Sequence, residues 1–413
     1  MFKTNTQCRI CKSPELEQFL SLGRMPPANA FLTAEQLTEP EMTFPLDVCL
    51  CANCALVQLK DVVDPELLFK NYVYASSTSP SFRAHFQSFA EHVYRRFRLD
   101  ARSLVIDVGS NDGILLKPFK ELGARTLGVD PAENLARQAT EAGIDTLPIF
   151  FGIKAAKIIA ETRGKAHIVT ANNVFAHVDD LDSFVQAVRA VLREDGIFIF
   201  EVPYLADLLT KNLFDTIYHE HLSYFSLRPL LYHFQKQEMQ ILDVQRVDSH
   251  GGSLRVFVRN ADSGQENEDS IRKFLNLEEE LLIYSFKTWQ GFSDRVQHNR
   301  EKFRNLLHEL KSAGKRIAGY GAPAKGNTLL NYFGITRKDL EYIADDSPLK
   351  QNLFTPGSHI PVFSPDRLSV DRPDYVLILA WNFADSIMAR LSSFRSSGGK
   401  FILPVPSPEV IEN

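Results

Sequence analysis

Apolar residues gather along this chain in short runs, and several of these runs end at a glycine or an acidic residue. The run 103–108 leads into a glycine turn at 109–113, and the run 126–129 ends at Asp130. Buried parallel strands in βαβ units are typically continuous apolar runs of this length, bounded by turn residues. The pattern therefore predicts a strand at both places. It also predicts strands over 167–173, 196–203, 374–380 and 400–403, and it repeats the strand-and-turn unit over 316–326 and 342–346.

Between these runs the spacing changes. Apolar residues recur at helical intervals over 278–310, and a second helical stretch covers about 81–97. The alternation over 46–50 is instead typical of a strand. We therefore predict an α/β protein with three domains: a small head at 1–70, a Rossmann-like middle domain at 71–245 and a second Rossmann-like domain at 246–413.

Composition excludes some classes of protein. The chain has 413 residues and a net charge of −5, so it lacks the basic excess with which nucleic-acid binders neutralise phosphates. No apolar run approaches the length that spans a bilayer, and the first residues lead into polar sequence without an apolar signal segment. We expect a cytoplasmic protein with no membrane or nucleic-acid partner. A monomer is the working expectation, although no motif specifies the oligomeric state.

The cysteines are confined to the head. Two C-x-x-C pairs, spaced as zinc ligands are, stand in a chain that we expect to be in a reducing compartment. Cys49 falls outside the pairs and belongs to the alternating strand. A site with four thiolates leaves no open position, so we predict a structural zinc ion rather than a catalytic one. Its ligands would be Cys8, Cys11, Cys51 and Cys54.

The first glycine turn carries an acid of its own. A dinucleotide site needs G-x-G-x-x-G so that backbone amides reach a pyrophosphate, whereas this turn reads G-S-N-D-G and Asp112 would repel phosphate. The turn suits a cofactor with a positive centre and a ribose, whose hydroxyls Asp130 would bind. The residues assigned to the cofactor are Asp107, Gly109, Asn111, Gly113 and Asp130.

The second glycine turn has the opposite charge. Lys325 stands at a helix start, and a lysine at a helix N-terminus favours an anion. We assign this turn, with Tyr320, to the diphosphate of a substrate. A nicotinamide-dependent oxidoreductase is the alternative, but the glycines at 319, 321 and 326 miss the required spacing. A non-catalytic zinc-dependent binding module is a third reading, and it leaves the proton-transfer groups below unexplained.

Those groups lie in the stretch 214–225. It places two imidazoles, a carboxylate and two phenols within eight residues, and each can move a proton. We read His221 as the catalytic base. The run 219–221 could instead chelate a metal, although no fourth ligand is evident. Arg255 and the turn at 250–253 are taken as structural.

These motifs resemble a broad class of enzymes and, taken together, a narrower family within that class. D-V-G-S-N-D-G at 107–113, followed by G-V-D-P at 128–131, looks like a class I S-adenosylmethionine-dependent methyltransferase. With the zinc pairs, Y-H-E-H-L-S-Y-F-S at 218–226, H-G-G-S-L-R at 250–255 and G-Y-G-A-P-A-K-G-N at 319–327, the whole chain resembles the sugar C-methyltransferases of deoxysugar biosynthesis. The resemblance implies methyl transfer from S-adenosylmethionine to a ring carbon, usually C-3', of a nucleotide-linked 4-keto-6-deoxy sugar. The nucleotide, thymidine or guanosine diphosphate, and the choice of C-3' or C-5' stay open.

The resemblance also implies roles for individual residues. His221 would be the base, Tyr218 and Glu220 would contact the sugar, and Asn173 at the end of the fourth strand would line the same pocket as the cofactor. A tyrosine of the polar loop 71–80 would join them. Either Tyr72 or Tyr74 fits, and we favour Tyr74 because it directly precedes A-S-S. Read alone, that loop is equally a linker with a helix cap or a lid.

Overall fold

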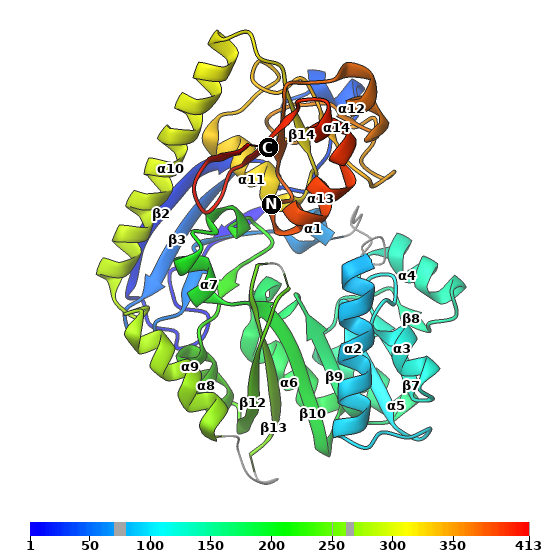
Figure 1. The fold of residues 1–413 in the computed structure, drawn as a ribbon. Coiled ribbons are helices and arrows are strands. Elements are labelled where there is room, and N and C mark those ends of the chain that lie inside the picture. Colours follow the sequence, from blue (N-terminus) through cyan, green and yellow to red (C-terminus); the bar gives the residue numbers. More distant parts are fainter. Residues whose placement is uncertain (70–79, 250, 262–267, 413) are drawn as a thin grey trace.

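A computed structural model describes residues 1–69, 80–249, 251–261 and 268–412 (Figure 1). The head is a sheet with an unusual fourth strand. Three strands come from the head itself, and the fourth, β11 (Ser223–Tyr224), comes from the stretch that holds His221. The order is β11-β4-β3-β2, and all neighbours are antiparallel. The head elements are β1 (Phe2–Thr4), β2 (Leu16–Met25), η1 (Glu35–Thr38), β3 (Phe44–Cys51), β4 (Val57–Leu59), β5 (Asp61–Val63) and α1 (Pro65–Phe69).

The middle domain is built on a seven-stranded sheet with the order β12-β13-β10-β9-β6-β7-β8. Strands β8, β7, β6, β9 and β10 are parallel, which confirms the predicted βαβ units. The strands are β6 (Leu104–Val108), β7 (Arg125–Val129), β8 (Thr146–Leu147), β9 (Ala166–Asn172), β10 (Leu192–Pro203), β12 (Met239–Val247) and β13 (Ser253–Asn260). The helices are α2 (Pro80–Arg96), α3 (Leu116–Glu121), α4 (Glu133–Glu141), α5 (Ile153–Arg163), α6 (Leu181–Val191), α7 (Leu205–Thr210) and α8 (Leu227–Lys236).

Both faces of this sheet are buried, which explains why its strands read as continuous apolar runs. Ile168 and Ile199 pack into a cluster with α2, while Val169 and Phe200 pack into a second cluster with α6. Figure 1 shows α2 in front of the sheet and α6 behind it. The two buried faces hold the carboxyl ends of β6, β7, β9 and β10 at one rigid edge.

The sheet continues past the predicted domain boundary at 245. β13 lies between β10 and β12 and pairs antiparallel with both. Arg255 on β13 donates from Nε to Oε1 of the buried Glu201 at 2.7 Å, so the end of this motif, residues 253–255, belongs to the middle sheet. A helix or strand pattern cannot show this, because pairing partners are set by tertiary contacts.

The C-terminal domain is a six-stranded sheet with the order β16-β15-β14-β17-β18-β19. It is parallel apart from β19, which adds an antiparallel edge that the sequence pattern did not predict. The strands are β14 (Ile317–Tyr320), β15 (Ile343–Ala344), β16 (Val362–Phe363), β17 (Tyr375–Ile378), β18 (Lys400–Leu403) and β19 (Glu409–Ile411). The helices are α11 (Ala324–Phe333), α12 (Asp366–Asp371), α13 (Ala384–Arg390) and α14 (Ser392–Ser396).

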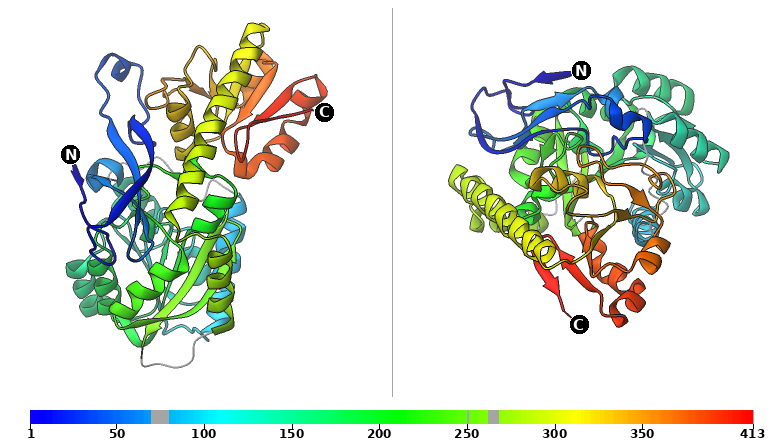
Figure 2. Two further views of the ribbon diagram at one scale, coloured as in Figure 1. Left: turned by 90° about the vertical axis from the view of Figure 1, so that its left-hand side faces the viewer. Right: turned by 90° about the horizontal axis from the view of Figure 1, so that it is seen from above.

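Two connecting helices, α9 (Glu268–Glu280) and α10 (Phe286–Ser312), join the two larger domains. The spacing over 278–310 predicted α10, whereas most of α9 precedes that range. Figure 2 shows α10 rising between the N-terminal sheet and the C-terminal domain. Trp289 of α10 packs on Phe19 of β2 with ring centres 5.1 Å apart. One apolar cluster therefore runs through all three domains. Within the described ranges, no helix is both long and apolar enough to cross a membrane.

Candidate active site

A cavity of about 540 Å³ lies where the three domains meet. Its floor is the carboxyl edge of the middle sheet, which is where open α/β sheets bind their ligands. The head contributes Asn29, the middle domain contributes the glycine turn and His221, and the C-terminal domain contributes Lys325. The cavity therefore has one part beside the first glycine turn and another beside the second.

The first glycine turn is shaped for close approach. Gly109 has a φ of +68°, and a Cβ there would lie 2.3 Å from Val174 Cγ2. Asp130, at the end of β7, accepts hydrogen bonds from the backbone amides of Asn111 at 2.8 Å and Ala132 at 2.9 Å. These bonds fix the carboxyl group at the cavity wall, while burial raises its pKa. Gly113 does not line the cavity: it turns the chain against Ile144.

Several buried polar atoms here have no partner within the part of the chain that the structure describes. They are the amide oxygen and nitrogen of Asn172, Oδ1 of Asn173 and Oγ of Ser110. All three residues line the cavity. Buried polar groups are normally hydrogen-bonded, so these atoms fit a polar ligand. Asn173 has a φ of +56°, and its backbone N–H donates to the Glu201 carbonyl at 2.8 Å. This bond holds the residue at the strand end.

Asp107 lies deeper at the same edge. Thr170 Oγ1 donates to its carboxyl oxygen at 2.6 Å. Burial raises the pKa of Asp107 to about 7, and the Thr170 bond opposes that rise. With Asp130 and the orphaned amides, these groups present both donors and acceptors to the amino acid and ribose parts of S-adenosylmethionine. The residues present thus fit that cofactor.

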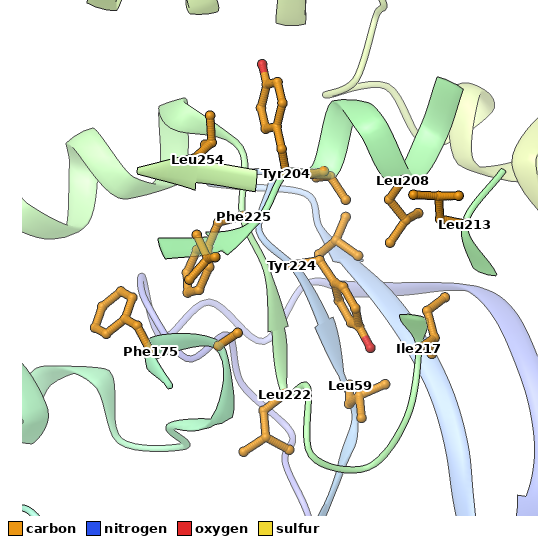
Figure 3. Packing of buried hydrophobic residues seen from close by; sticks show 14 of the residues in the cluster. Leu59, Phe175, Tyr204, Leu208, Leu213, Ile217, Leu222, Tyr224, Phe225 and Leu254 are labelled. Atoms are coloured by element: carbon orange, nitrogen blue, oxygen red, sulfur yellow. The ribbon is translucent and has the colours of Figure 1, made fainter. Parts of the chain in front are cut away.

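His221 is held as a neutral imidazole of one tautomer. Its Nδ1 lies 2.8 Å from the Thr216 carbonyl oxygen, which can only accept, so Nδ1 carries the proton and Nε2 has a free lone pair. The side chain is 8% exposed and lines the cavity. Burial lowers the pKa of His221 to about 4, against the opposing effect of the Thr216 bond. Figure 3 shows the apolar packing of Ile217, Leu222 and Tyr224 around this stretch.

Two aromatic rings flank the imidazole. The Tyr218 ring centre lies 4.0 Å from that of His221, and Tyr218 lines the cavity. On the other side His177 stacks on His221 with centres 5.1 Å apart, and it also lines the cavity. Sequence reasoning gave His177 no role. Its signal was its place just after β9, since residues that follow parallel strands gather at the ligand edge.

Glu220 lies elsewhere than expected. It is 2% exposed, does not line the cavity, and accepts a hydrogen bond from Asn29 Nδ2 at 2.6 Å. It makes no contribution to the pKa of His221. Asn29 of the head stands at the cavity in its place, and nothing in the sequence pattern singled it out. An asparagine in a loop has no periodicity to connect it with a distant carboxylate.

His219 faces the head, away from His221. Its Nε2 lies 3.3 Å from the Phe44 carbonyl oxygen. The His221 amide donates to the Tyr218 carbonyl at 2.9 Å, so this stretch forms a turn rather than an extended strand. The three side chains have different partners, namely Phe44 for His219, Asn29 for Glu220 and Thr216 for His221, and so do not converge on one ion. Among the residues that the structure describes, one group of side chains has the geometry of a metal site, and it is the cysteine cluster.

The four predicted cysteines do converge. Their Sγ atoms all lie within 4.8 Å of one another, with 3.5 Å between those of Cys8 and Cys54 and between those of Cys11 and Cys51. Four sulfurs about 2.3 Å from one zinc ion lie roughly 3.8 Å apart in a tetrahedron, so the cluster fits a structural zinc site. Cys49 lies on β3 outside this group, as predicted.

The second glycine turn places Lys325 at the cavity. Its Nζ donates to Asn382 Oδ1 at 2.5 Å and lies 3.6 Å from the centre of the Trp381 ring. Burial lowers the pKa of Lys325, and the charge of Asp215 opposes this. Lys350, which sequence reasoning missed, also lines the cavity and donates to the Ala322 carbonyl at 2.9 Å.

Tyr320 does not reach the cavity. It is buried in β14, and its hydroxyl donates to the Asp346 carboxylate at 3.1 Å. The structure therefore does not place Tyr320 at the cavity, as its assignment to the substrate requires, and the side chain packs instead in an apolar cluster with Val376 and Phe401. Tyr72 and Tyr74 lie outside the described residues.

Three family models match the chain in the order of its domains. They are a putative zinc binding domain over 8–69, a methyltransferase domain over 82–244 and a C-methyltransferase C-terminal domain over 248–406. The fold and the site thus define a methyltransferase that uses S-adenosylmethionine and carries zinc in its head.

One relative that matches the whole chain shows which kind of methyltransferase this is. The chain is 38% identical over 405 residues to the C-methyltransferase NovU of Streptomyces niveus, covering 98% of this chain and 96% of that one. The chain therefore belongs to the C-methyltransferase family. This overturns the oxidoreductase and the non-catalytic binding module as alternatives.

Two other similarities cover less than half of this chain. A ubiquinone biosynthesis O-methyltransferase of Rhodopseudomonas palustris (strain HaA2) is 33% identical over 113 residues, which are 25% of this chain and 44% of that relative. Magnesium protoporphyrin IX methyltransferase from Synechocystis PCC 6803, solved with bound SAM, is 13% identical with a TM-score of 0.33, over 43% of this chain and 79% of that one.

Proposed function

We propose that this C-methyltransferase methylates a ring carbon next to the ketone of a nucleotide-linked 4-keto-6-deoxy sugar, at C-3', with C-5' as the alternative. The observation that carries the proposal is the state of His221: a neutral imidazole, protonated on Nδ1, with Nε2 free at a cavity shared by both glycine turns. The name of NovU and the C-terminal family model support methylation of carbon, while the nucleotide-linked sugar follows from the family resemblance of the motifs.

Carbon methylation first requires removal of a proton. A ring C–H is unreactive toward an electrophilic methyl group unless a neighbouring ketone stabilises the carbanion as an enolate. Nε2 of His221 takes that proton and the imidazole becomes a cation. With a pKa of about 4, His221 is deprotonated throughout the neutral range, but it is a weaker base than an ordinary imidazole. Stabilisation of the enolate oxygen must therefore carry much of the step.

Donors for that oxygen stand beside the base. The Tyr218 ring contacts His221, and the Asn173 amide lines the same wall. Hydroxyl and amide donors in a water-poor cavity stabilise a developing oxyanion far better than they would in water. Bound S-adenosylmethionine, held by Asp130, Asn172 and the Gly109 turn, supplies an electrophilic methyl group on a sulfonium.

The nucleotide diphosphate is assigned to the C-terminal wall of the cavity. Lys325 begins α11, whose free backbone amides add to the positive field, and Lys350 stands at the same wall. Anchoring the nucleotide on one domain and the cofactor on another fixes the reacting carbon relative to the methyl group. That placement lowers the entropic part of the barrier.

The test is an incubation in deuterated water with a panel of thymidine and guanosine diphosphate-linked 4-keto-6-deoxy sugars, read by mass spectrometry. We expect deuterium to exchange at the carbon next to the ketone, followed by a mass gain of one methyl group when the cofactor is present. His221→Ala should lower both rates by about 10²- to 10⁴-fold while cofactor binding, measured by calorimetry, is retained. Normal exchange in that variant would assign the base elsewhere.

A further inference from the structure

The short turn η4 (Phe214–Thr216) connects the catalytic stretch to the C-terminal domain through three consecutive residues. Phe214 packs on Phe333 of α11 with ring centres 5.3 Å apart. The carbonyl oxygen of Thr216 accepts the hydrogen bond from His221 Nδ1. The residue between them, Asp215, has no part in the chemistry described above and does not line the cavity.

Asp215 is fully buried, at 0% exposed. One of its carboxylate oxygens accepts a hydrogen bond from Trp381 Nε1 at 2.6 Å. Trp381 begins η5 (Trp381–Phe383) in the C-terminal domain, after β17. A buried carboxylate is costly unless it is paired, so a specific bond of this kind across two domains holds them in one arrangement.

The same indole carries a cation on its face. Lys325 Nζ lies 3.6 Å from the centre of the Trp381 ring, while the ring edge donates to Asp215. The lysine that lines the cavity and the carboxylate behind the catalytic stretch are thus linked through one side chain. Gly251 leaves room for this indole, since a Cβ there would lie 2.8 Å from it.

We propose that Asp215 is a positioning residue for His221. Its bond to Trp381 fixes η4 to the C-terminal domain, and the Thr216 carbonyl then holds the imidazole in the form protonated on Nδ1, with Nε2 free toward the substrate. This inference rests on the proposed role of His221 as the base. It explains why an acid is buried beside the catalytic stretch, outside the cavity.

A positioning role differs from a purely structural one in what it controls. A neutral imidazole exchanges between two tautomers, and only the form with the proton on Nδ1 leaves Nε2 able to accept a proton. If η4 is released, the Thr216 carbonyl moves and the preference for that tautomer weakens. The tautomer can be observed directly by nitrogen NMR of the full chain, without substrate.

The experiment compares wild type with Asp215→Ala, which removes the acceptor for Trp381 Nε1, after selective ¹⁵N labelling of histidine, with the His221 signals assigned by their loss in His221→Gln. We expect wild type to show one tautomer, protonated on Nδ1, and Asp215→Ala to show a mixture. Its kcat for methyl transfer should fall about tenfold or more, because small misplacements of a reacting group are costly. The KM for S-adenosylmethionine should change less than about twofold.

Trp381→Phe keeps an aromatic ring for Lys325 and removes the N–H donor together with part of the indole, so it should reproduce the mixed tautomer. The double variant should lose little beyond either single change, as expected for two residues that act through one bond. The matched control is Asp243→Ala, which removes another buried carboxylate, paired with Arg96 at 2.7 Å, on β12. It should leave the His221 tautomer unchanged.

An unchanged tautomer and unchanged kcat in folded Asp215→Ala would overturn the proposal. If that variant fails to fold, Trp381→Phe decides the question by the same readout. If wild type methylates no nucleotide-linked sugar, the proposed function fails, while the tautomer comparison still decides whether Asp215 positions His221. The two failures are therefore distinguishable.

Discussion

His221 is neutral because it is buried and because no carboxylate in the described part of the chain stabilises its charged form. The backbone carbonyl of Thr216 orients the ring without adding a negative charge. A neighbouring carboxylate would raise the pKa of the imidazole, and Nε2 would then be protonated at neutral pH. The turn at 214–216 thus provides orientation without protonation.

A titration follows from this. Since burial lowers the folded-state pKa of His221 to about 4, the imidazole stays neutral as the pH falls from 8 to 5 and gains a proton only near 4. Below that point its capacity to accept the substrate proton is lost. Selective ¹⁵N NMR of histidine across this range measures the midpoint. A midpoint at or above 6.5, the ordinary value, would contradict the account of His221.

Gly109 lies in the turn at the cofactor wall, where there is no room for a side chain. Gly109→Ala places a methyl group 2.3 Å from Val174 Cγ2 at a left-handed backbone position, so the turn must move at the cofactor wall. We expect S-adenosylmethionine binding to weaken more than about tenfold, as measured by calorimetry. The control is Gly23→Ala, at φ +81° with no atom within 4 Å of its Cβ, which carries the backbone strain alone. Equal loss of binding in both variants would contradict the claim that the close contact between residue 109 and Val174 is what requires glycine.

At this scale the sequence identified residues with distinctive chemistry and missed those defined by contact. The cysteines, His221, Lys325 and the first glycine turn follow from residue type and spacing. Asn29 and Lys350 come from loops of other domains and reach the cavity only through the tertiary fold. Glu220 was assigned to the sugar by resemblance, and its burial against Asn29 depends on a packing arrangement that no local pattern encodes.

Among the elements, β11 connects the head, which holds the cysteine cluster, with the stretch that holds His221. It follows His221 directly and pairs with β4, the strand after the last zinc cysteine. The Leu59 amide also donates to the Leu222 carbonyl at 2.9 Å. Arg9, between two of the cysteines, donates to Asp179 at the cavity wall at 3.0 Å. The head therefore supports one side of the active site.

Removing a zinc ligand should consequently affect the site as well as the head. For Cys51→Ser we expect loss of bound zinc, a lower melting temperature and loss of most methyl transfer, because structural zinc contributes directly to folding free energy. Cys49→Ser is the matched control, since Cys49 is buried on the same strand but outside the cluster. Zinc content by mass spectrometry and thermal unfolding are the measurements. Full zinc content in Cys51→Ser would refute the ligand assignment.

The predictability of elements follows the same division. The central strands of both parallel sheets were evident because doubly buried strands are apolar runs that end in turn residues. The outer parallel strands β8 and β16 have two residues each and were not predicted. β11 was not, since it has two residues and pairs with a strand more than 150 positions earlier in the chain. The β12–β13 pair lies across the predicted boundary for a related reason: sheet membership is decided by non-local pairing.

For the molecule as a whole, the cavity depends on all three domains. We expect Lys325→Met to raise the KM for the nucleotide-linked sugar more than about tenfold and to leave the KM for S-adenosylmethionine nearly unchanged, because the charge stands on the C-terminal wall alone. Steady-state kinetics with each substrate varied in turn measure both constants. Lys315→Met, at an exposed lysine paired with Asp374, controls for loss of charge. An equal change in both KM values would place the lysine in a shared structural role.

The central claim is that the base makes a carbon nucleophile next to a ketone. The most direct measurement is NMR of the sugar product formed with S-adenosylmethionine carrying a ¹³C methyl group. We predict that the labelled methyl carbon is bonded to the ring carbon adjacent to the ketone. A labelled methyl group bonded to oxygen or nitrogen would contradict the account.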